Sequence, residues 1–380
     1  MKNVIRLLFM IIVCLAGCSR EPMIQIDSSV QASLDAKVKQ SDDTSSVEEP
    51  ASTTSLVDLN TFTLLPEGSV LSLYDYSPIY PNQLKVYSDG QQTYMMYLNF
   101  INENGTLLQV SEHLGTNNVN TKVFAFEQGA LMQSAEYAGT AVMPYLLQSP
   151  SQNELPPRIM LQEPIMVGTT WSSDGVSQSA ITALYEKGTI HQLEYHNIIE
   201  VSTNFETYTL KEYYAAQEGL ILTWIVPTGE GVAEQQWQLV ENYHGVKWTD
   251  EVTMAVPKDG DGAILQRESA LLSCQTNETL AQAFTSLFRE KGWLNDQVSI
   301  QQLVLDNNVV TVDFTPGIVA SVNAHANQEE RLLPAIVQTL ADYYQVQHVR
   351  LTVGGLILTP DRLVVPADGI WQVDAQWLGE

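Results

Sequence analysis

The chain has 380 residues and is strongly acidic, with 44 Asp and Glu residues against 18 Lys and Arg residues and a formal net charge of −26 at pH 7. Nucleic-acid binding needs clustered Lys and Arg to contact phosphates, so this composition argues against a nucleic-acid partner. The same charge disfavours peripheral binding to anionic lipid head groups. Cys274 is the one cysteine after residue 18, so the sequence predicts no intramolecular disulfide in the body of the chain.

The first 18 residues have the layout of an export signal. A basic start with Lys2 and Arg6 precedes an apolar run at residues 7–15, which is too short to span a bilayer as a helix. Residues 15–18 read Leu-Ala-Gly-Cys, and this tetrad resembles the lipobox of bacterial lipoproteins. The resemblance implies that residues 1–18 are a lipoprotein signal peptide and that Cys18 is the site of lipid attachment.

A lipid on Cys18 would anchor the protein at the extracytoplasmic face of the cell membrane, because two acyl chains hold a protein stably where a single chain exchanges. In an organism with two membranes, Ser19 would favour the outer membrane under the usual sorting pattern of lipoproteins. The alternative is an ordinary secretory signal with a chance cysteine, which also predicts export.

Residues 19–57 are predicted to form a disordered acidic tether. They are rich in Ser, Thr, Asp and Glu, they contain no aromatic residue, and residues 42–50 are particularly acidic. Such a segment cannot bury enough apolar surface to offset the entropy lost on ordering. A flexible coil of this length spans about 35 Å on average, so it would separate the lipid anchor from the folded part.

Residues 58–249 are predicted to form an all-β domain of antiparallel strands, curved into a half-barrel or barrel. Short runs rich in Tyr, Val, Ile, Thr and Trp alternate with Gly, Asn and Asp turn signals, and no helical periodicity of useful length occurs. The clearest runs are residues 92–100, 106–110, 192–201, 208–214, 219–226 and 234–240. A meander of this kind is typical of curved antiparallel sheets.

Residues 250–380 have a mixed pattern that predicts an α+β domain with two helices on one sheet. The first helix is expected to have Thr276 as its N-cap, Glu278 in its first turn and Gly292 after its end. Pro334 predicts that the second helix begins near Leu332. The expected strands are residues 252–256, 263–273, 299–305, 309–314 and 348–353. The expected apolar faces comprise Leu280, Phe284, Leu287 and Phe288 in the first helix and Leu333, Ile336, Val337, Leu340 and Tyr344 in the second.

Three segments of this domain carry a family resemblance: Val310-Thr-Val-Asp-Phe314, Ile336-Val-Gln-Thr-Leu340 and Val349-Arg-Leu-Thr-Val-Gly354. Their order resembles the GerMN domain of spore germination and sporulation proteins over about residues 250–375. Gln338 stands where the family tends to have Asn, and residues 323–327 replace its Gly-rich turn. The resemblance implies a non-enzymatic module on extracytoplasmic lipoproteins, and it transfers no catalytic residue.

Six tyrosines lie close together in the sequence, at positions 74, 76, 80, 87, 94 and 97. Tyrosine combines a flat apolar ring with a polar tip, so the six could line a groove for a glycan or a peptide. The more common situation is a sheet that favours aromatic residues, and the six tyrosines could simply belong to such a sheet.

The sequence contains no nucleophile elbow, no His-Glu-x-x-His motif and no phosphate loop. His191 and His196 are five residues apart, so on one strand they would face opposite sides and could not share a metal. Residues 259–262 place two carboxylates in a turn but lack the later ligands of a calcium loop, which favours a simple tight turn. Cys274 is expected to be a small buried apolar residue. We therefore expect no catalytic, cofactor-binding or metal-binding residue.

These features favour a non-catalytic, membrane-tethered envelope protein that acts as a scaffold or binds a protein partner, in sporulation, germination or envelope assembly. The alternative is a lipoprotein whose β domain holds an apolar or glycan ligand. An envelope hydrolase is a weaker alternative, because no acid–base pair can be named. For partner binding, we expect the contact to involve the sheet face left uncovered by the two helices, or an exposed strand edge.

Overall fold

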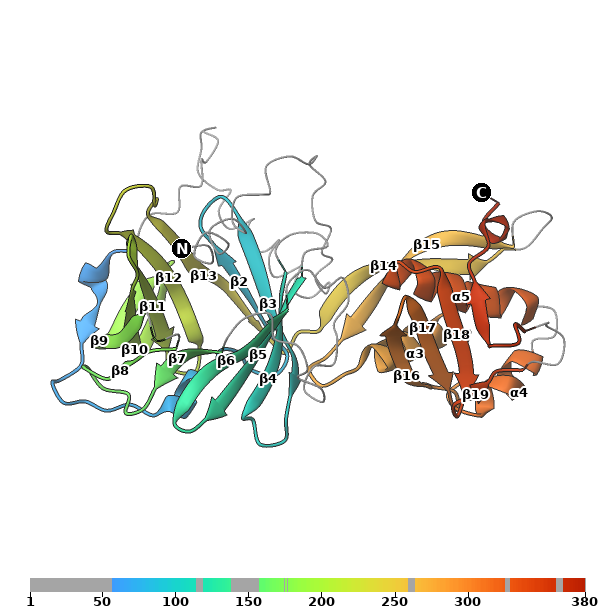
Figure 1. The fold of residues 1–380 in the computed structure, drawn as a ribbon, viewed down its shortest axis with the longest axis horizontal. Coiled ribbons are helices and arrows are strands. Elements are labelled where there is room, and N and C mark those ends of the chain that lie inside the picture. Colours follow the sequence, from blue (N-terminus) through green and yellow to red (C-terminus); the bar gives the residue numbers. More distant parts are fainter. Residues whose placement is uncertain are drawn as a thin grey trace, which may run out of the picture.

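The structure is a computed structural model that describes residues 57–113, 119–137, 157–173, 175, 177–258, 264–324, 329–359 and 365–379. Within these residues the fold is α+β, with mostly antiparallel strands and three α-helices. Figure 1 shows a large β-sheet built from residues 63–244 and, beside it, a smaller part that contains the helices. Cys18 and the predicted tether up to residue 56 lie outside the described residues.

Residues 63–244 contribute thirteen strands to one sheet, which we call the large sheet. Its order is β1-β9-β10-β11-β12-β13-β2-β3-β4-β5-β6-β7, and β8 also pairs with β9. All its ladders are antiparallel, as the alternating runs predict. The strands are β1 (Thr63–Leu64), β2 (Gln83–Ser88), β3 (Thr93–Ile101), β4 (Leu107–His113), β5 (Val119–Glu127), β6 (Ala130–Tyr137), β7 (Arg158–Gln162), β8 (Thr170–Trp171), β9 (Gln178–Ile190), β10 (Leu193–Asn204), β11 (Tyr208–Ala215), β12 (Gly219–Pro227) and β13 (Gln235–His244).

The large sheet folds back on itself. Arg158 in β7 forms an ion pair with Glu212 in β11, although these strands lie far apart in the sheet order. Near this end, the indole N–H of Trp171 donates to the carbonyl of Ile159 at 3.0 Å, and the N–H of Ile159 donates to Ser173 Oγ at 2.8 Å. No ladder joins β7 to β8 or β9 among the described strands, so the sheet is not a closed barrel. The half-barrel shape stays a prediction.

The C-terminal part, which we define as residues 246–379, contains a two-stranded ribbon and a five-stranded sheet. The ribbon pairs β14 (Trp248–Pro257) with β15 (Leu265–Cys274) along their whole length. The sheet has the order β16-β17-β18-β19, and β20 also pairs with β18; the β17–β18 ladder is parallel. Its strands are β16 (Ile300–Asp306), β17 (Val309–Phe314), β18 (His348–Val353), β19 (Leu356–Ile357) and β20 (Ile370–Gln372).

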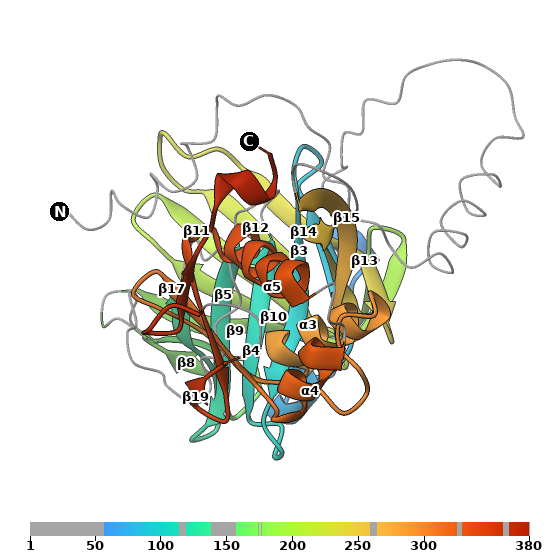
Figure 2. The ribbon, with the colours of Figure 1, turned by 90° about the vertical axis from the view of Figure 1, so that its right-hand side faces the viewer.

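Three helices pack beside the ribbon and the five-stranded sheet; the first and the last contact both, and the middle one packs against the last (Figure 2). They are α3 (Leu280–Glu290), α4 (Gly317–Ala324) and α5 (Glu329–Tyr344). Buried side chains of both sheets and all three helices share one hydrophobic cluster, separate from that of the large sheet. Members of this cluster include Val252, Met254, Phe284, Phe288, Val312, Phe314, Ile318, Ile336, Leu340 and Leu351. The helices therefore pack on two sheets, not on one as predicted.

Three helix predictions were wrong in detail. The N-cap of α3 is Thr279, not Thr276, because Thr279 and Gln282 form a reciprocal capping box. Helix α5 begins at Glu329, before Pro334 and not near Leu332. Pro334 removes only one main-chain donor near the helix start, while the fully buried Leu333 holds this turn in the core. Helix α4 was not predicted, because its short apolar sequence has no amphipathic period.

The predicted boundary at residues 249 and 250 falls inside strand β14, which begins at Trp248. Trp248 pairs with Cys274 and Asp250 pairs with Leu272, so a division at this point would cut a complete ladder. Residues 245–247, between β13 and β14, are a better place to separate the two parts.

Candidate functional site

The contact between the large sheet and the C-terminal part is made by the residues that follow β15. Thr276 accepts a hydrogen bond from the N–H of Asn82 at 2.8 Å, and its own hydroxyl donates to the carbonyl of Leu98 at 2.8 Å. The side chain of Asn277 accepts from the N–H of Ile101 at 2.8 Å. Thr276, which the sequence suggested as a helix cap, is thus a connecting residue.

Aromatic residues also contribute to the contact between the large sheet and the C-terminal part. The rings of His113 in β4 and Trp248 in β14 stack with their centroids 3.9 Å apart. The hydroxyl of Tyr97 donates to the carbonyls of Val246 and Cys274 at 3.1 and 3.3 Å. Burial lowers the pKa of His113 to about 4, so its ring is neutral near pH 7.

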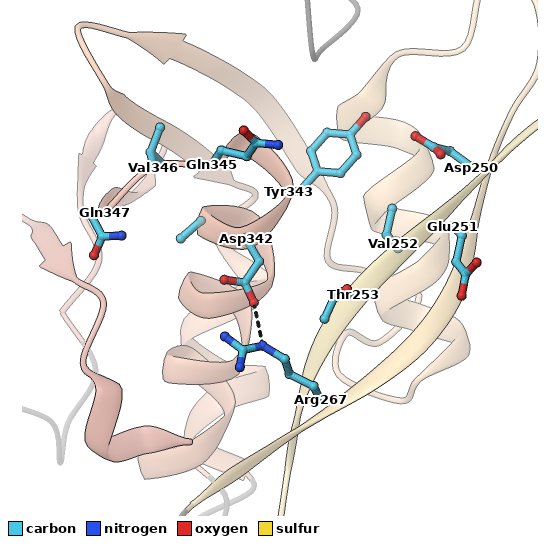
Figure 3. Close-up of a pocket in the computed structure, with 11 residues that line it drawn as sticks. Asp250, Glu251, Val252, Thr253, Arg267, Asp342, Tyr343, Gln345, Val346 and Gln347 are labelled. Carbon is cyan, nitrogen blue, oxygen red and sulfur yellow. Dashed lines mark hydrogen bonds and ion pairs between the residues drawn. The ribbon is translucent and has the colours of Figure 1, made fainter. Parts of the chain in front are cut away.

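A groove lies on the C-terminal part, between the ribbon and the last turn of α5 (Figure 3). Residues 250–253 of β14 and Arg267 of β15 line one side, and residues 341–343 and 345–347 line the other. The Nε of Arg267 lies 3.4 Å from Asp342 Oδ2 across the groove. In Figure 3 the ring of Tyr343 points towards Asp250 on the opposite side.

The groove is acidic. Its lining contains three carboxylates, those of Asp250, Glu251 and Asp342, against the single cation of Arg267. The negative end of the α5 dipole adds to this field, because α5 has no basic residue in its last turn. Partial burial raises the pKa of Asp250, and the hydrogen bond from the main-chain N–H of Glu251 offsets only part of this rise. Such a lining suits basic side chains of a protein, and it contains no paired nucleophile and base.

Four polar residues of the three resemblance segments, Asp313, Gln338, Thr339 and Thr352, have partners within the protein. Asp313 of the Val-Asp-Phe strand accepts hydrogen bonds from the hydroxyl of Thr352 at 2.6 Å and from the N–H of Gly355 at 2.8 Å, and so holds the turn after β18. Thr339 accepts from the N–H of Ala255 at 3.0 Å and joins α5 to β14. Gln338 donates to Asp342 at 2.7 Å, one turn further along α5. These segments therefore maintain the fold.

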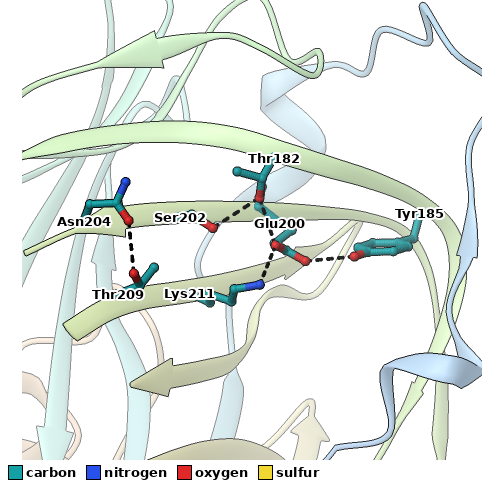
Figure 4. A network of polar contacts seen from close by, with 7 residues as sticks. All are labelled: Thr182, Tyr185, Glu200, Ser202, Asn204, Thr209 and Lys211. Carbon is teal, nitrogen blue, oxygen red and sulfur yellow. Dashed lines mark hydrogen bonds and ion pairs between the residues drawn. The ribbon is translucent and has the colours of Figure 1, made fainter. Parts of the chain in front are cut away.

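A buried polar network lies on the large sheet (Figure 4). Glu200 in β10 is 5% exposed and accepts hydrogen bonds from Thr182 at 2.9 Å, Tyr185 at 2.8 Å and Lys211 at 3.0 Å. Burial by itself raises the pKa of Glu200, but the contacts with Tyr185 and Lys211 outweigh it and hold the pKa below its ordinary value. A carboxylate held ionised by three donors is suited to structure, not to proton transfer.

Other charged groups inside the large sheet also form ion pairs or hydrogen bonds within the protein. Lys122 pairs with Glu112 at 2.7 Å, and Arg158 pairs with Glu212, whose side chain is 5% exposed. Lys85 is fully buried and donates to the carbonyl of Pro78 at 2.9 Å and to that of Glu218. Burial lowers the pKa of Lys85 to about 7. These groups connect strands and loops of the large sheet.

The tyrosines do not line a common groove. Tyr76, Tyr87 and Tyr97 are about 1% exposed and donate their hydroxyls to main-chain carbonyls. Tyr94 stacks on Tyr87, whereas Tyr74 is 66% exposed. Tyr80 is half-buried. The interpretation as residues of a sheet core accounts for most of this set.

Cys274 is 3% exposed, and burial raises the pKa of its thiol to about 12, which fits a small buried apolar residue. Among the described residues no cluster of His, Cys, Asp and Glu is arranged to hold a metal ion. His191 lies at the β9–β10 turn and His196 within β10. Residues 259–262, the predicted tight turn, and His325 lie outside the described residues.

A comparison with known protein families finds a match that covers most of the C-terminal part. Residues 242–359 match the model of the Germane family, which is described as "Sporulation and spore germination". The C-terminal part resembles the Germane family. This match confirms the predicted GerMN resemblance and links roughly a third of the chain to sporulation and spore germination. Comparisons with curated proteins and with solved structures found no match.

No helix in the described ranges is long and apolar enough to cross a membrane. The predicted anchor residue, Cys18, lies outside those ranges, so lipid attachment stays a prediction.

Proposed function

We propose that this chain is a non-catalytic lipoprotein of the cell envelope that binds a protein partner through its C-terminal part during sporulation or germination. The observation that carries this proposal is the structural use of the resemblance segments. Asp313, Gln338 and Thr339 each bond to the protein itself, which supports a structural role for the characteristic residues of the matched region.

The architecture of the C-terminal part supports a binding role. Its helices pack on one face of the five-stranded sheet, and the opposite face carries half-exposed and exposed side chains, including Val304, Thr311 and Arg350. The acidic groove beside α5 adds a second exposed feature. Specific protein contacts use surfaces of this kind, in which apolar and charged groups are mixed.

The alternative of a glycan-binding or apolar-ligand-binding large sheet rested on the six tyrosines, and half of these are buried in the core. Lipid on Cys18 would hold the protein at the membrane. The tether, which spans about 35 Å on average, would let the C-terminal part reach a partner away from the membrane surface.

The experiment is mild crosslinking in the native envelope, followed by purification of the full-length chain and of a variant that lacks residues 246–380. The proposal predicts a defined protein partner that is lost with the deletion. A matched control deletes residues 20–40 of the tether, which should keep the partner. Turnover of a peptidoglycan, peptide or ester substrate by the purified chain, abolished by one acidic or His substitution, would contradict a non-catalytic role.

A further inference from the structure

Strand β16 differs from the other sheet ends in the described part of the chain. It is seven residues long, lies at the end of the five-stranded sheet and has no strand on its other side. At the end of the large sheet, β7 is contacted by Ser173 and Trp171, and β1 has only two residues. In the ribbon, β15 contains the charged Arg267 and Glu268 and β14 contains the charged Asp250 and Glu251, whereas β19 and β20 have only two and three residues. Charged side chains or a short length hinder those edges from pairing with a strand of another chain. Strand β16 has neither protection, because it is seven residues long and carries no charge before Asp306.

The turn after β16 shows which main-chain groups face the free side. Asn307 and Asn308 both have positive φ, so they form a two-residue turn whose flanking residues, Asp306 and Val309, are a hydrogen-bonded pair. Hydrogen-bonded and non-hydrogen-bonded pairs alternate along an antiparallel ladder. Leu303 and Leu305 therefore belong to non-hydrogen-bonded pairs, and their N–H and C=O groups point to the free edge.

The side chains of β16 are apolar or neutral up to its last residue. Val304 is 41% exposed and Leu305 is 43% exposed, and Gln301 and Gln302 are also exposed. Apolar side chains at such an edge provide pockets for alternate residues of an added strand, while the main-chain groups provide affinity.

We propose that the β16 edge binds an extended segment of the partner protein, which adds a strand beside Leu303 and Leu305. This proposal rests on the proposed function and names the surface that performs it. The occupant is a neutral or basic segment of a different protein. A second copy of this chain would bring another formal charge of −26 against the first, whereas a neutral or basic segment is not repelled by this net negative charge.

The test places a photo-crosslinking residue at Gln301 in the full-length chain and activates it in the native envelope. Leu305→Pro removes the edge-facing N–H without removing a bond of the β16–β17 ladder, so the chain should fold while strand addition fails. Leu305→Lys adds a charge to the edge and serves as a second variant. Leu305→Ala keeps the N–H, and Leu356→Lys adds the same charge on β19, where Leu356 is 75% exposed.

We expect an adduct with another protein, whose crosslinked segment carries no net negative charge. Its yield should fall about tenfold or more in Leu305→Pro and Leu305→Lys, fall less in Leu305→Ala, and stay within about twofold in Leu356→Lys. An adduct with a second copy of this chain, or with an acidic segment, would overturn the stated occupant.

The two proposals fail in different ways. If deletion of residues 246–380 removes the partner but both Leu305→Pro and Leu305→Lys keep the adduct, the β16 edge is not the surface and the proposed function stands. If the deletion removes no partner, the proposed function fails, and the edge proposal fails with it.

Discussion

We expect the contact between the two parts of the molecule to be sensitive to pH, because the ring of His113 is buried against that of Trp248. The pKa of His113 is about 4 in the folded chain and about 6.5 when the ring is exposed. Between these values the unfolded chain binds more protons, so the free energy of unfolding falls as pH falls from 6.5 towards 4, by on the order of 2–3 kcal/mol. At higher pH both states are neutral and the contribution is constant.

His113→Phe keeps an aromatic ring at this position and removes the titration. Urea unfolding at pH 7 and at pH 5, followed by tryptophan fluorescence, should show a smaller loss of stability on acidification in the variant than in the unmodified chain. An equal loss in both proteins would show that His113 is not held neutral by its contact with Trp248.

Glu200 gives a second prediction for a single residue. Glu200→Gln leaves Lys211 without its counter-charge in a half-buried position, so the free energy of unfolding should fall by about 1–3 kcal/mol. The matched control is Glu194→Gln, which breaks the exposed pair with Lys187 and should cost less than about 0.5 kcal/mol. Equal costs in denaturant unfolding would indicate that the network in Figure 4 does not stabilise the sheet.

Among the elements, α5 connects the ribbon to the five-stranded sheet. Leu340 is fully buried in the hydrophobic cluster that both share, so Leu340→Ala should lower the free energy of unfolding by about 2–5 kcal/mol. Ser286→Ala on the exposed side of α3 is the control and should change it by less than about 0.5 kcal/mol. A cost for Leu340→Ala close to that of the control would exclude α5 as the central packing element.

The elements of the C-terminal part show what the sequence could predict. The apolar face of α3 and the β16–β17 hairpin follow from local periodicity and from the Asn307-Asn308 turn, and both are present. The Thr279 cap was also predictable, because Gln282 stands three residues later, as a capping box requires. Helix α4 was not, since its apolar residues have no period and it is held by the core that it enters.

The candidate surfaces were harder to predict. An exposed strand edge was expected, but the sequence could not identify β16, because an edge depends on which strands find partners elsewhere. The groove combines residues of β14, β15, α5 and the segment after α5 that are up to about a hundred positions apart in the sequence. Thr276 and Asn82 meet over a separation of 194 residues, and no local pattern reports such a contact.

At the scale of the whole molecule, the two hydrophobic clusters share no residue. A fragment of residues 246–380 keeps the complete ribbon and its own cluster, so it should be compact and unfold in one cooperative step. Hydrogen exchange and urea unfolding of the fragment check this. Exchange without protection in α5 and β18 would show that the C-terminal part depends on the large sheet for folding.

Attachment to the membrane depends on Cys18. Cys18→Ser should abolish acylation and leave either an unprocessed precursor or a soluble form. Intact-mass spectrometry of detergent-extracted protein measures the result directly. A mature chain that begins at Cys18 and has no added acyl mass would contradict the predicted anchor.

The central proposal is that the C-terminal part is the partner-binding unit of this chain. Calorimetric titration of the crosslinked partner, once it is purified, against the full chain, against residues 246–380 and against residues 57–245 tests this claim most directly. The account predicts that residues 246–380 bind with an affinity within about threefold of the full chain, and that residues 57–245 do not bind. Binding by residues 57–245 alone would contradict it and would assign the function to the large sheet.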